Sequence, residues 1–246
     1  MKRFTPLFIA CFIAFPLLHS CLSGNFKEIK GNYTIVNEKI AIDDYEGIIL
    51  GVPAEVIYQQ ISQAEPFLQV LVDENILPRL KISVEDHCLV ISQNTDSMLR
   101  PTQFKIYTNS RSLCKVEIAG TGNILMEKEV NSQDMDILIS GVGNVKTDSL
   151  YCEILKVKIT GAGDAEINGA ATNATFSIDG TGSIKAFGYL VQDLNCSING
   201  AGDVEAYVSK NLNANVSGVG NLRYKGNPET VVTNINGVGD IRKTNE

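Results

Sequence analysis

Closely spaced glycines are the residues of this sequence whose type and spacing could form a binding loop. The segment INGAGDV at residues 198–204 returns as VSGVGNL at 216–222 and as INGVGDI at 235–241. Backbone N–H groups in such a loop can bind phosphate, but the loop then has to lead into a helix. No helical pattern follows these segments, so we interpret the glycines as turn residues.

The glycine motif is repeated along the second half of the chain. Gly-x-Gly followed by Asn, Asp or Ser occurs seven times, at intervals of 21, 20, 19, 20, 18 and 19 residues. The expected turn residues are Gly120, Gly122, Asn123, Gly141, Gly143, Asn144, Gly161, Gly163, Asp164, Gly180, Gly182, Ser183, Gly200, Gly202, Asp203, Gly218, Gly220, Asn221, Gly237, Gly239 and Asp240. Such self-similarity predicts a solenoid. Glycine allows positive φ and carries no Cβ to collide with the next turn, and Asn or Asp can bond its own turn or stack on its neighbour.

Apolar residues alternate with polar ones before and after each glycine motif. The position two residues before the first glycine is Ile in six repeats and Val in the other. A period of two indicates strands with one buried face, and equal columns in every repeat indicate parallel stacking. An apolar patch near Leu150, Ala170 and Leu190 suggests a third strand per turn. Because the connections are too short for helices, we predict an all-β, right-handed parallel β-helix with about 20 residues per turn, its hand following the usual crossover preference.

The N-terminus has the pattern of an export signal. Lys2 and Arg3 precede the apolar run 7–18, which is short for a membrane span. The following Leu-His-Ser-Cys at 18–21 resembles the lipobox of bacterial lipoproteins, which implies cleavage before Cys21 and its acylation. The alternative is an ordinary secretory signal. We therefore expect a lipoprotein signal peptide at 1–20, a lipid-anchored tether at 21–44 and the β-helix domain at 45–246, with glycine repeats from 118 to 241.

Charge limits the classes of partner. The net charge is −7, and loss of Lys2 and Arg3 would bring it to about −9. This acidity argues against nucleic acid, and we expect membrane contact only through the lipid anchor. The position after Gly-x-Gly holds Asn, Asp or Ser, and no two aspartates occupy it in successive repeats. The clustered carboxylates that a metal needs are therefore missing, and we expect neither metal nor cofactor. The next outward column alternates in sign from Lys146 through Glu166 and Lys185 to Glu205, as expected for pairs across turns.

Four cysteines follow Cys21, but the register argues against a disulfide between repeats. Cys114 and Cys196 fall on inward columns four turns apart, far beyond disulfide reach. Cys152 also falls on an inward position. We interpret these three as buried apolar residues, and a partner for Cys88 stays open.

The front half of the chain leads to a family resemblance. Strand patterns occur in GIIL, AEVIYQQ, FLQVLVD, LKISVED, CLVISQ and FKIYT, with a turn and a short helical piece in DENILPRL. We expect these to form less regular first turns that cap the rod. Together with the Ile-x-Gly-x-Gly-Asn/Asp turns, this pattern over about 45–243 resembles the head GIN domain of auto-transporter adhesins, which implies a right-handed parallel β-helix and an adhesin. No barrel segment is visible, so the lipid anchor would replace the auto-transporter route.

Three functions stay open. The first is an adhesin or scaffold that binds a surface glycan or protein through outward short polar residues, unless these only solvate the sheet. The candidate ligand face is Thr175, Ser177, Asn195, Ser197, Asn213, Asn215 and Asn234. The second is a polysaccharide lyase or hydrolase, although the even repeats leave no room for loops and His87 reads as a solvated strand end. The third is a self-assembling envelope protein, a homo-oligomer with open strand edges. Ser97 and Ser149 follow Asp and precede an apolar residue, as in one bacterial O-glycosylation signal.

Overall fold

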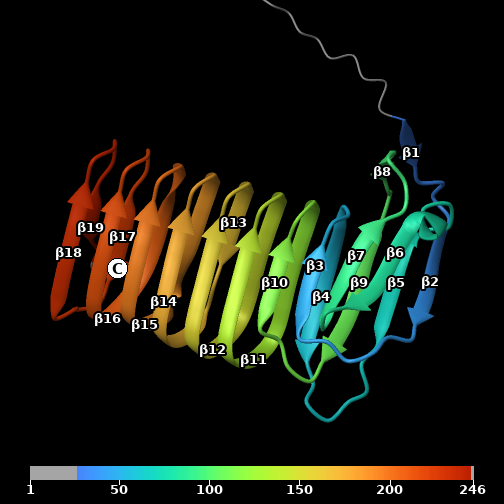
Figure 1. Cartoon of the computed structure of the whole chain (residues 1–246), viewed down its shortest axis with the longest axis horizontal. Coiled ribbons are helices and arrows are strands. Elements are labelled where there is room, and N and C mark those ends of the chain that lie inside the picture. The colour runs from blue at the N-terminus through green and yellow to red at the C-terminus, as the bar shows by residue number, and fades with distance from the viewer. Residues whose placement is uncertain (1–26, 245–246) are drawn as a thin grey trace, which may run out of the picture.

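The computed structural model describes residues 27–244, which form an all-β rod with an irregular cap at one end (Figure 1). The predicted parallel β-helix is confirmed, with about six turns and parallel pairs about 20 residues apart. The strands are β1 (Glu28–Lys30), β2 (Ile35–Ile40), β3 (Gly47–Leu50), β4 (Ala54–Gln60), β5 (Leu68–Asp73), β6 (Leu80–Glu85), β7 (Cys88–Gln93), β8 (Met98–Arg100), β9 (Phe104–Ser110), β10 (Lys115–Ile118), β11 (Thr121–Ile139), β12 (Val142–Ile159), β13 (Ala162–Glu166), β14 (Gly169–Ile178), β15 (Thr181–Ile198), β16 (Ala201–Val216), β17 (Leu222–Lys225), β18 (Thr230–Ile235) and β19 (Ile241–Lys243). One 3-10 helix, η1 (Leu77–Arg79), lies between β5 and β6. Within 27–244 we find no helix with the length and apolarity needed to cross a bilayer.

Two long sides of the rod are built from different halves of each turn. On side A, the neighbours run β2, β5, β9, β4, the first parts of β11 and β12, then β13, the first parts of β15 and β16, β17 and β19. On side B, they run β6, β7, β3, β10, the later parts of β11 and β12, then β14, the later parts of β15 and β16, and β18. The Gly-x-Gly motifs form the corner between the end of side B and the start of the next side A.

The core consists of stacked apolar columns. From Ile118 to Val216, the residue two positions before each glycine motif is buried in every turn. Two positions earlier, Phe176 fills the column beside the smaller Cys196 and Ala214, so large and small side chains compensate across neighbouring turns. Each fully buried Ile or Leu contributes about 1.5–3 kcal/mol. The alternation seen in the sequence is therefore the direct consequence of one side-chain face being shared by all turns.

A third, shorter side closes each turn, and the three residues of the apolar patch do not share one column there. The paired register shifts between Ala186 and Leu190 where β15 meets β16. Leu150 is buried. Ala170 and Leu190 do not share its column, because Leu150 pairs with Gly169, and the partly exposed Ala170 and exposed Leu190 lie outward. The bend adds residues to the turn, which reverses the side-chain alternation that simple spacing assumes.

The cap is less regular than a set of first turns, because part of it is antiparallel. β5 pairs antiparallel with both β2 and β9, and β6 pairs antiparallel with β7. The expected helical piece is present as η1. The signal peptide and Cys21 lie outside the described residues. Inside the range expected for the tether, β1 and β2 are strands, since Val36 and Ile40 pack on the core and β2 extends side A.

Candidate functional site

The glycine corners stack so closely that they leave space for nothing but glycine. A Cβ built on Gly182, where φ is +150°, would lie 1.7 Å from the carbonyl oxygen of Gly163 in the preceding turn. Gly202 stands in the same relation to Gly182, and Gly220 to Gly202. Since these backbones are already in contact, the corner has no cradle for a phosphate. The geometry is that of a structural turn.

The Asn/Asp column beside the corner bonds to the neighbouring turn. The Asn144 side-chain oxygen accepts the Asp164 backbone N–H at 3.0 Å, and an Asp164 oxygen accepts the Ser183 N–H at 2.8 Å. The same contact joins Asn123 to Asn144, Asp203 to Asn221 and Asn221 to Asp240. Each of these side chains therefore bonds the backbone of the adjacent turn. The sequence alone suggests either a bond within the residue's own turn or stacking on its neighbour.

The alternating charge column on side A forms one of its expected ion pairs, and one more with Arg223 of the following turn. Lys146 pairs with Glu166 at 2.8 Å, and Arg223 pairs with Glu205. The Glu166 hydrogen bond raises the pKa of Lys146 above its usual range. Lys185 instead pairs with Asp164 of the preceding turn at 3.1 Å. All of these groups are solvated, so each pair is worth under about 1 kcal/mol.

The predicted ligand face lies on side B, over the later parts of β14, β15 and β16 and on β18. We call it the polar face; its residues are Thr175, Ser177, Asn195, Ser197, Asn213, Asn215 and Asn234, all exposed or partly exposed. Side-chain hydrogen bonds join neighbouring turns, from Asn213 to Asn195 at 3.2 Å, from Ser197 to Ser177 at 3.2 Å and from Asn234 to Asn215 at 2.9 Å. The structure therefore brings these residues together as in-register ladders.

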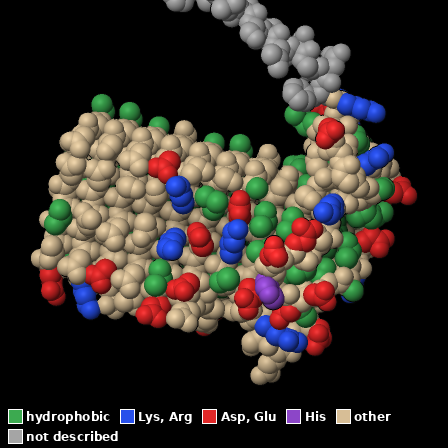
Figure 2. All heavy atoms as spheres, viewed as in Figure 1, with side chains coloured by type: hydrophobic (Ala, Val, Ile, Leu, Met, Phe, Trp, Pro, Cys, Tyr) green, Lys and Arg blue, Asp and Glu red, His purple; other side chains and the backbone are tan. Residues whose placement is uncertain are grey.

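The same side is charged nearer the cap. Figure 2 shows Lys, Arg, Asp and Glu gathered over the middle turns and the cap, while uncharged surface covers much of the C-terminal turns. The charged part holds ion pairs of Lys115 with Glu117 at 3.0 Å and of Lys158 with Asp179 at 3.1 Å. At its lower edge, a hollow of about 480 Å³ is lined mainly by Cys114, Lys115, Asp134 and Lys156. Opposite charges are mixed there, so it has no bias toward one kind of ion.

Cys114 is exposed, which corrects its expected place in the core. It lies before β10 begins, and its backbone N–H and thiol both bond the Glu46 carbonyl oxygen, so the thiol points away from the inward column. Cys152 is half-buried with its sulfur 3.2 Å from the Tyr189 hydroxyl. Cys196 is buried as predicted, and burial raises the pKa of its thiol to about 12. Among residues 27–244 all four cysteines are free, including Cys88.

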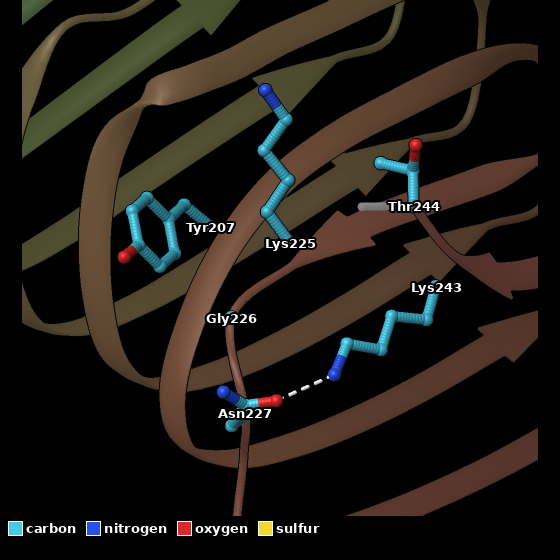
Figure 3. A pocket seen from close by; sticks show the side chains of 6 residues that line it. All are labelled: Tyr207, Lys225, Gly226, Asn227, Lys243 and Thr244. Carbon is cyan, nitrogen blue, oxygen red and sulfur yellow. Dashed lines mark hydrogen bonds between the residues drawn. The ribbon is translucent and has the colours of Figure 1, made fainter. Parts of the chain in front are cut away.

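A hollow at the C-terminal end of the rod was missed from the sequence. Its volume is about 340 Å³. Figure 3 shows the residues that line it, which are Tyr207, Lys225, Gly226, Asn227, Lys243 and Thr244. The Lys225 ammonium lies 4.5 Å from the centre of the Phe187 ring, and Lys243 donates to the Asn227 side-chain oxygen at 2.5 Å. Gly226 has a φ of +95°, and a Cβ there would lie 2.0 Å from the Val208 carbonyl oxygen and 3.0 Å from the Tyr207 ring. The lining is basic and polar, with no acid among its described residues.

Groups suited to catalysis do not converge on any of these surfaces in the described residues. His87 is exposed in the two-residue turn between β6 and β7, where it and Asp86 both have positive φ. This position agrees with the predicted solvated strand end. No group of three His, Cys, Asp or Glu side chains within 27–244 could hold a metal. Of the two serines in motifs that resemble an O-glycosylation signal, Ser97 is buried and Ser149 is half-buried. The expectations of no cofactor and no metal stay predictions.

The fold and surfaces define a repeat protein, a β-solenoid with broad flat sides instead of a cleft. The model of the family described as "Putative auto-transporter adhesin, head GIN domain" matches residues 44–228, and the chain belongs to this family. The match stops before β18, so β18, the last glycine motif and β19 lie beyond it. A search among curated proteins finds no match.

Solved structures agree with this assignment. A putative adhesin from Bacteroides fragilis is 27% identical with a TM-score of 0.83, covering 88% of this chain and 100% of that one. A putative lipid binding protein from Parabacteroides distasonis is 30% identical with a TM-score of 0.71, covering 89% and 100%. A putative adhesin from Parabacteroides distasonis is 28% identical with a TM-score of 0.70 over the same shares. The predicted family is therefore confirmed.

Proposed function

We propose that the protein is a non-catalytic adhesin or scaffold of the cell envelope, which binds a surface glycan or protein through the polar face. The observation that carries this proposal is the set of cross-turn amide and hydroxyl ladders on a flat, uncharged part of side B. Membership in a family of adhesin-like proteins supports a binding role over a catalytic one.

The chemistry of the ladders suits a hydroxyl-rich ligand. An asparagine side chain has two N–H donors and a carbonyl oxygen with two lone pairs. In the ladder, Asn213 uses one N–H on Asn195, and Asn234 uses one on Asn215. The remaining donor and lone pairs face solvent, and the same bonds limit side-chain motion before a ligand arrives. Pre-ordering lowers the entropy lost on binding, so many weak hydrogen bonds can add up to a useful affinity.

The flatness of the side favours an extended ligand. Outward side chains of successive turns repeat about every 4.8 Å, because that is the spacing of neighbouring strands. A polymer lying along the rod can therefore meet equivalent groups in successive turns, whereas a small molecule would find no enclosing wall. An extended glycan or a repetitive protein surface is the ligand class that matches this shape.

The test compares two variants of the full-length protein on immobilised cell-wall and host-surface glycans. Replacing Asn195, Asn213 and Asn215 together by Ala should weaken binding at least about tenfold, equivalent to about 1.4 kcal/mol. The matched control replaces Lys146 and Glu166 together by Ala, which removes an ion pair on side A at constant net charge, and it should bind like the wild type. Equal binding of the triple variant and the wild type would contradict the proposal, and shortened glycan chains in the supernatant would favour the lyase or hydrolase.

A further inference from the structure

Both ends of the rod expose unpaired strand edges, and one edge differs from the rest. Among the described residues, β2, β6, β18 and β19 each pair along one edge only. Natural sheets protect such edges with charged residues. β2, β6 and β19 all carry charges, whereas β18, with the sequence TVVTNI, carries none and is exposed along its whole length. β18 is therefore open to pairing with another strand.

The inward side chains of β18 have the apolar character of a core that nothing covers. Val231 and Ile235 are both 43% exposed, although they continue the columns of Leu212 and Val216, which are each 1% exposed. Their exposure arises only because no further turn lies on them. A strand added to β18 would bury them as the other columns are buried, at about 25 cal/mol per Å² of apolar area.

The cap end presents a complementary surface between its two edges. A hollow of about 270 Å³ lies between β6 and the segment that leaves β2, with Ile40, Ile42, Ile82 and Val84 in its lining. All four pack against the core while only partly buried. Apolar side chains from a second rod could cover this hollow as well as the edges on either side of it.

Charge favours joining unlike ends. Residues 223–244 carry four basic and two acidic side chains, whereas residues 27–112 carry twelve acidic and eight basic ones. Joining two C-terminal ends would bring Arg242 and Lys243 of β19 against their own equivalents, and like charges on facing strands are destabilising. Joining the C-terminal end to the cap of a second copy instead places basic groups near acidic ones.

We propose that copies of this chain associate head to tail, with the C-terminal end of one rod on the cap of the next. The strand directions allow both sides to continue through the contact. On side B, β6 runs opposite to β7 and hence to β18, so β18 would pair antiparallel with β6 of the next copy. On side A, β2 runs parallel to β9 and β4, so it would pair parallel with β19. This contact is heterologous and can extend into short filaments. It is independent of ligand binding by the polar face.

The test is sedimentation of the full-length protein in detergent up to about 100 μM, where contacts of micromolar affinity would be populated. We expect concentration-dependent oligomers that weaken with added salt. Ile235→Lys places a charge on the inward column that the second copy would cover. This substitution should raise the apparent dissociation constant of the association at least about tenfold. Val232→Lys is a second variant that leaves the inward column intact and should act in the same direction. Asn173→Lys is the matched control, because Asn173 is exposed on the same side in a middle turn and lies outside the polar face, and it should associate like the wild type.

A charge exchange identifies the orientation. Lys243 and Glu38 both lie on the inward face of their edge strands, since Lys243 pairs with Tyr224 and Glu38 pairs with the buried Val70. Lys243→Glu on β19 and Glu38→Lys on β2 should each weaken association, and the double variant should recover it, because both charges reverse across one contact. A protein that stays monomeric over the whole range would overturn the proposal. So would association that none of these substitutions changes, since the contact would then lie elsewhere, for example in the acylated N-terminus.

Discussion

At the scale of single residues, Asp73 shows how one buried carboxylate joins separate pieces of the cap. Its oxygens accept the Tyr33 N–H at 2.8 Å, the Thr102 N–H at 2.7 Å and the Thr102 hydroxyl at 2.7 Å. Burial by itself raises the pKa of this carboxyl, but the hydrogen bonds from Thr102 and Tyr33 outweigh it and lower the pKa below its usual value. The charged form is therefore the one that the cap stabilises.

This pKa shift predicts the pH dependence of an Asp73→Asn variant. Because the folded-state pKa is depressed, the Asp73 contribution to stability is present above about pH 4 and is lost as the pH falls through the folded-state pKa. Urea unfolding should therefore show Asp73→Asn less stable by about 1–3 kcal/mol at pH 7, with a smaller difference at pH 3. The exposed Asp43→Asn should change stability by less than about 0.5 kcal/mol at both pH values. A difference that is the same at pH 7 and pH 3 would contradict this assignment.

At the scale of elements, each turn is held by what the next turn allows. The corner glycines approach the preceding turn's carbonyl oxygens too closely for any side chain, and the Asn/Asp column bonds across the same gap. Both features are invisible within one turn and appear only when turns stack. The repeated motif therefore encodes the contact between turns as much as the bend itself.

Gly182→Ala should destabilise the rod by about 2–4 kcal/mol, since the added methyl overlaps the Gly163 carbonyl oxygen and positive φ is unfavourable for alanine. Thermal or urea unfolding measures the loss. Gly51→Ala is the control, because its nearest neighbour would be the Ile91 carbonyl oxygen at 3.3 Å and the backbone there does not demand glycine. If both variants lose the same stability, the stacking argument fails.

At the scale of the whole molecule, the rod has flat sides, a cap at the N-terminal end and an uncovered turn at the other (Figure 1). In such solenoids each turn contacts mainly its neighbours, so an end without a cap is a weak point unless something covers it. An anchor near the cap would leave the polar face accessible along the rod. Acylation of Cys21 stays a prediction from the lipobox-like sequence at 18–21.

Replacing Cys21 by Ser should move the protein from the membrane fraction to the soluble fraction, because each buried methylene of an acyl chain contributes about 0.8 kcal/mol of membrane affinity. Cell fractionation and intact mass report the change. Cys88→Ser is the control, which should stay on the membrane. Protease added to intact cells should degrade the wild-type protein if it is displayed as an adhesin, whereas complete protection would place it inside the envelope and contradict adhesion.

The repeat alone was sufficient to predict the solenoid, since seven glycine motifs in phase with alternating apolar residues are compatible with few other folds. The inward columns and the outward polar face followed from the same register, whereas the strands of the cap were predicted from their own apolar patterns. Local pattern could not predict Cys114, Ala170 or Leu190, because a bend or a strand start shifts the alternation and only the pairing of neighbouring strands reveals it. The same holds for Asp73 and for the bare edge of β18. Their environment depends on segments far apart in the chain, and burial and pairing are properties of the assembled rod.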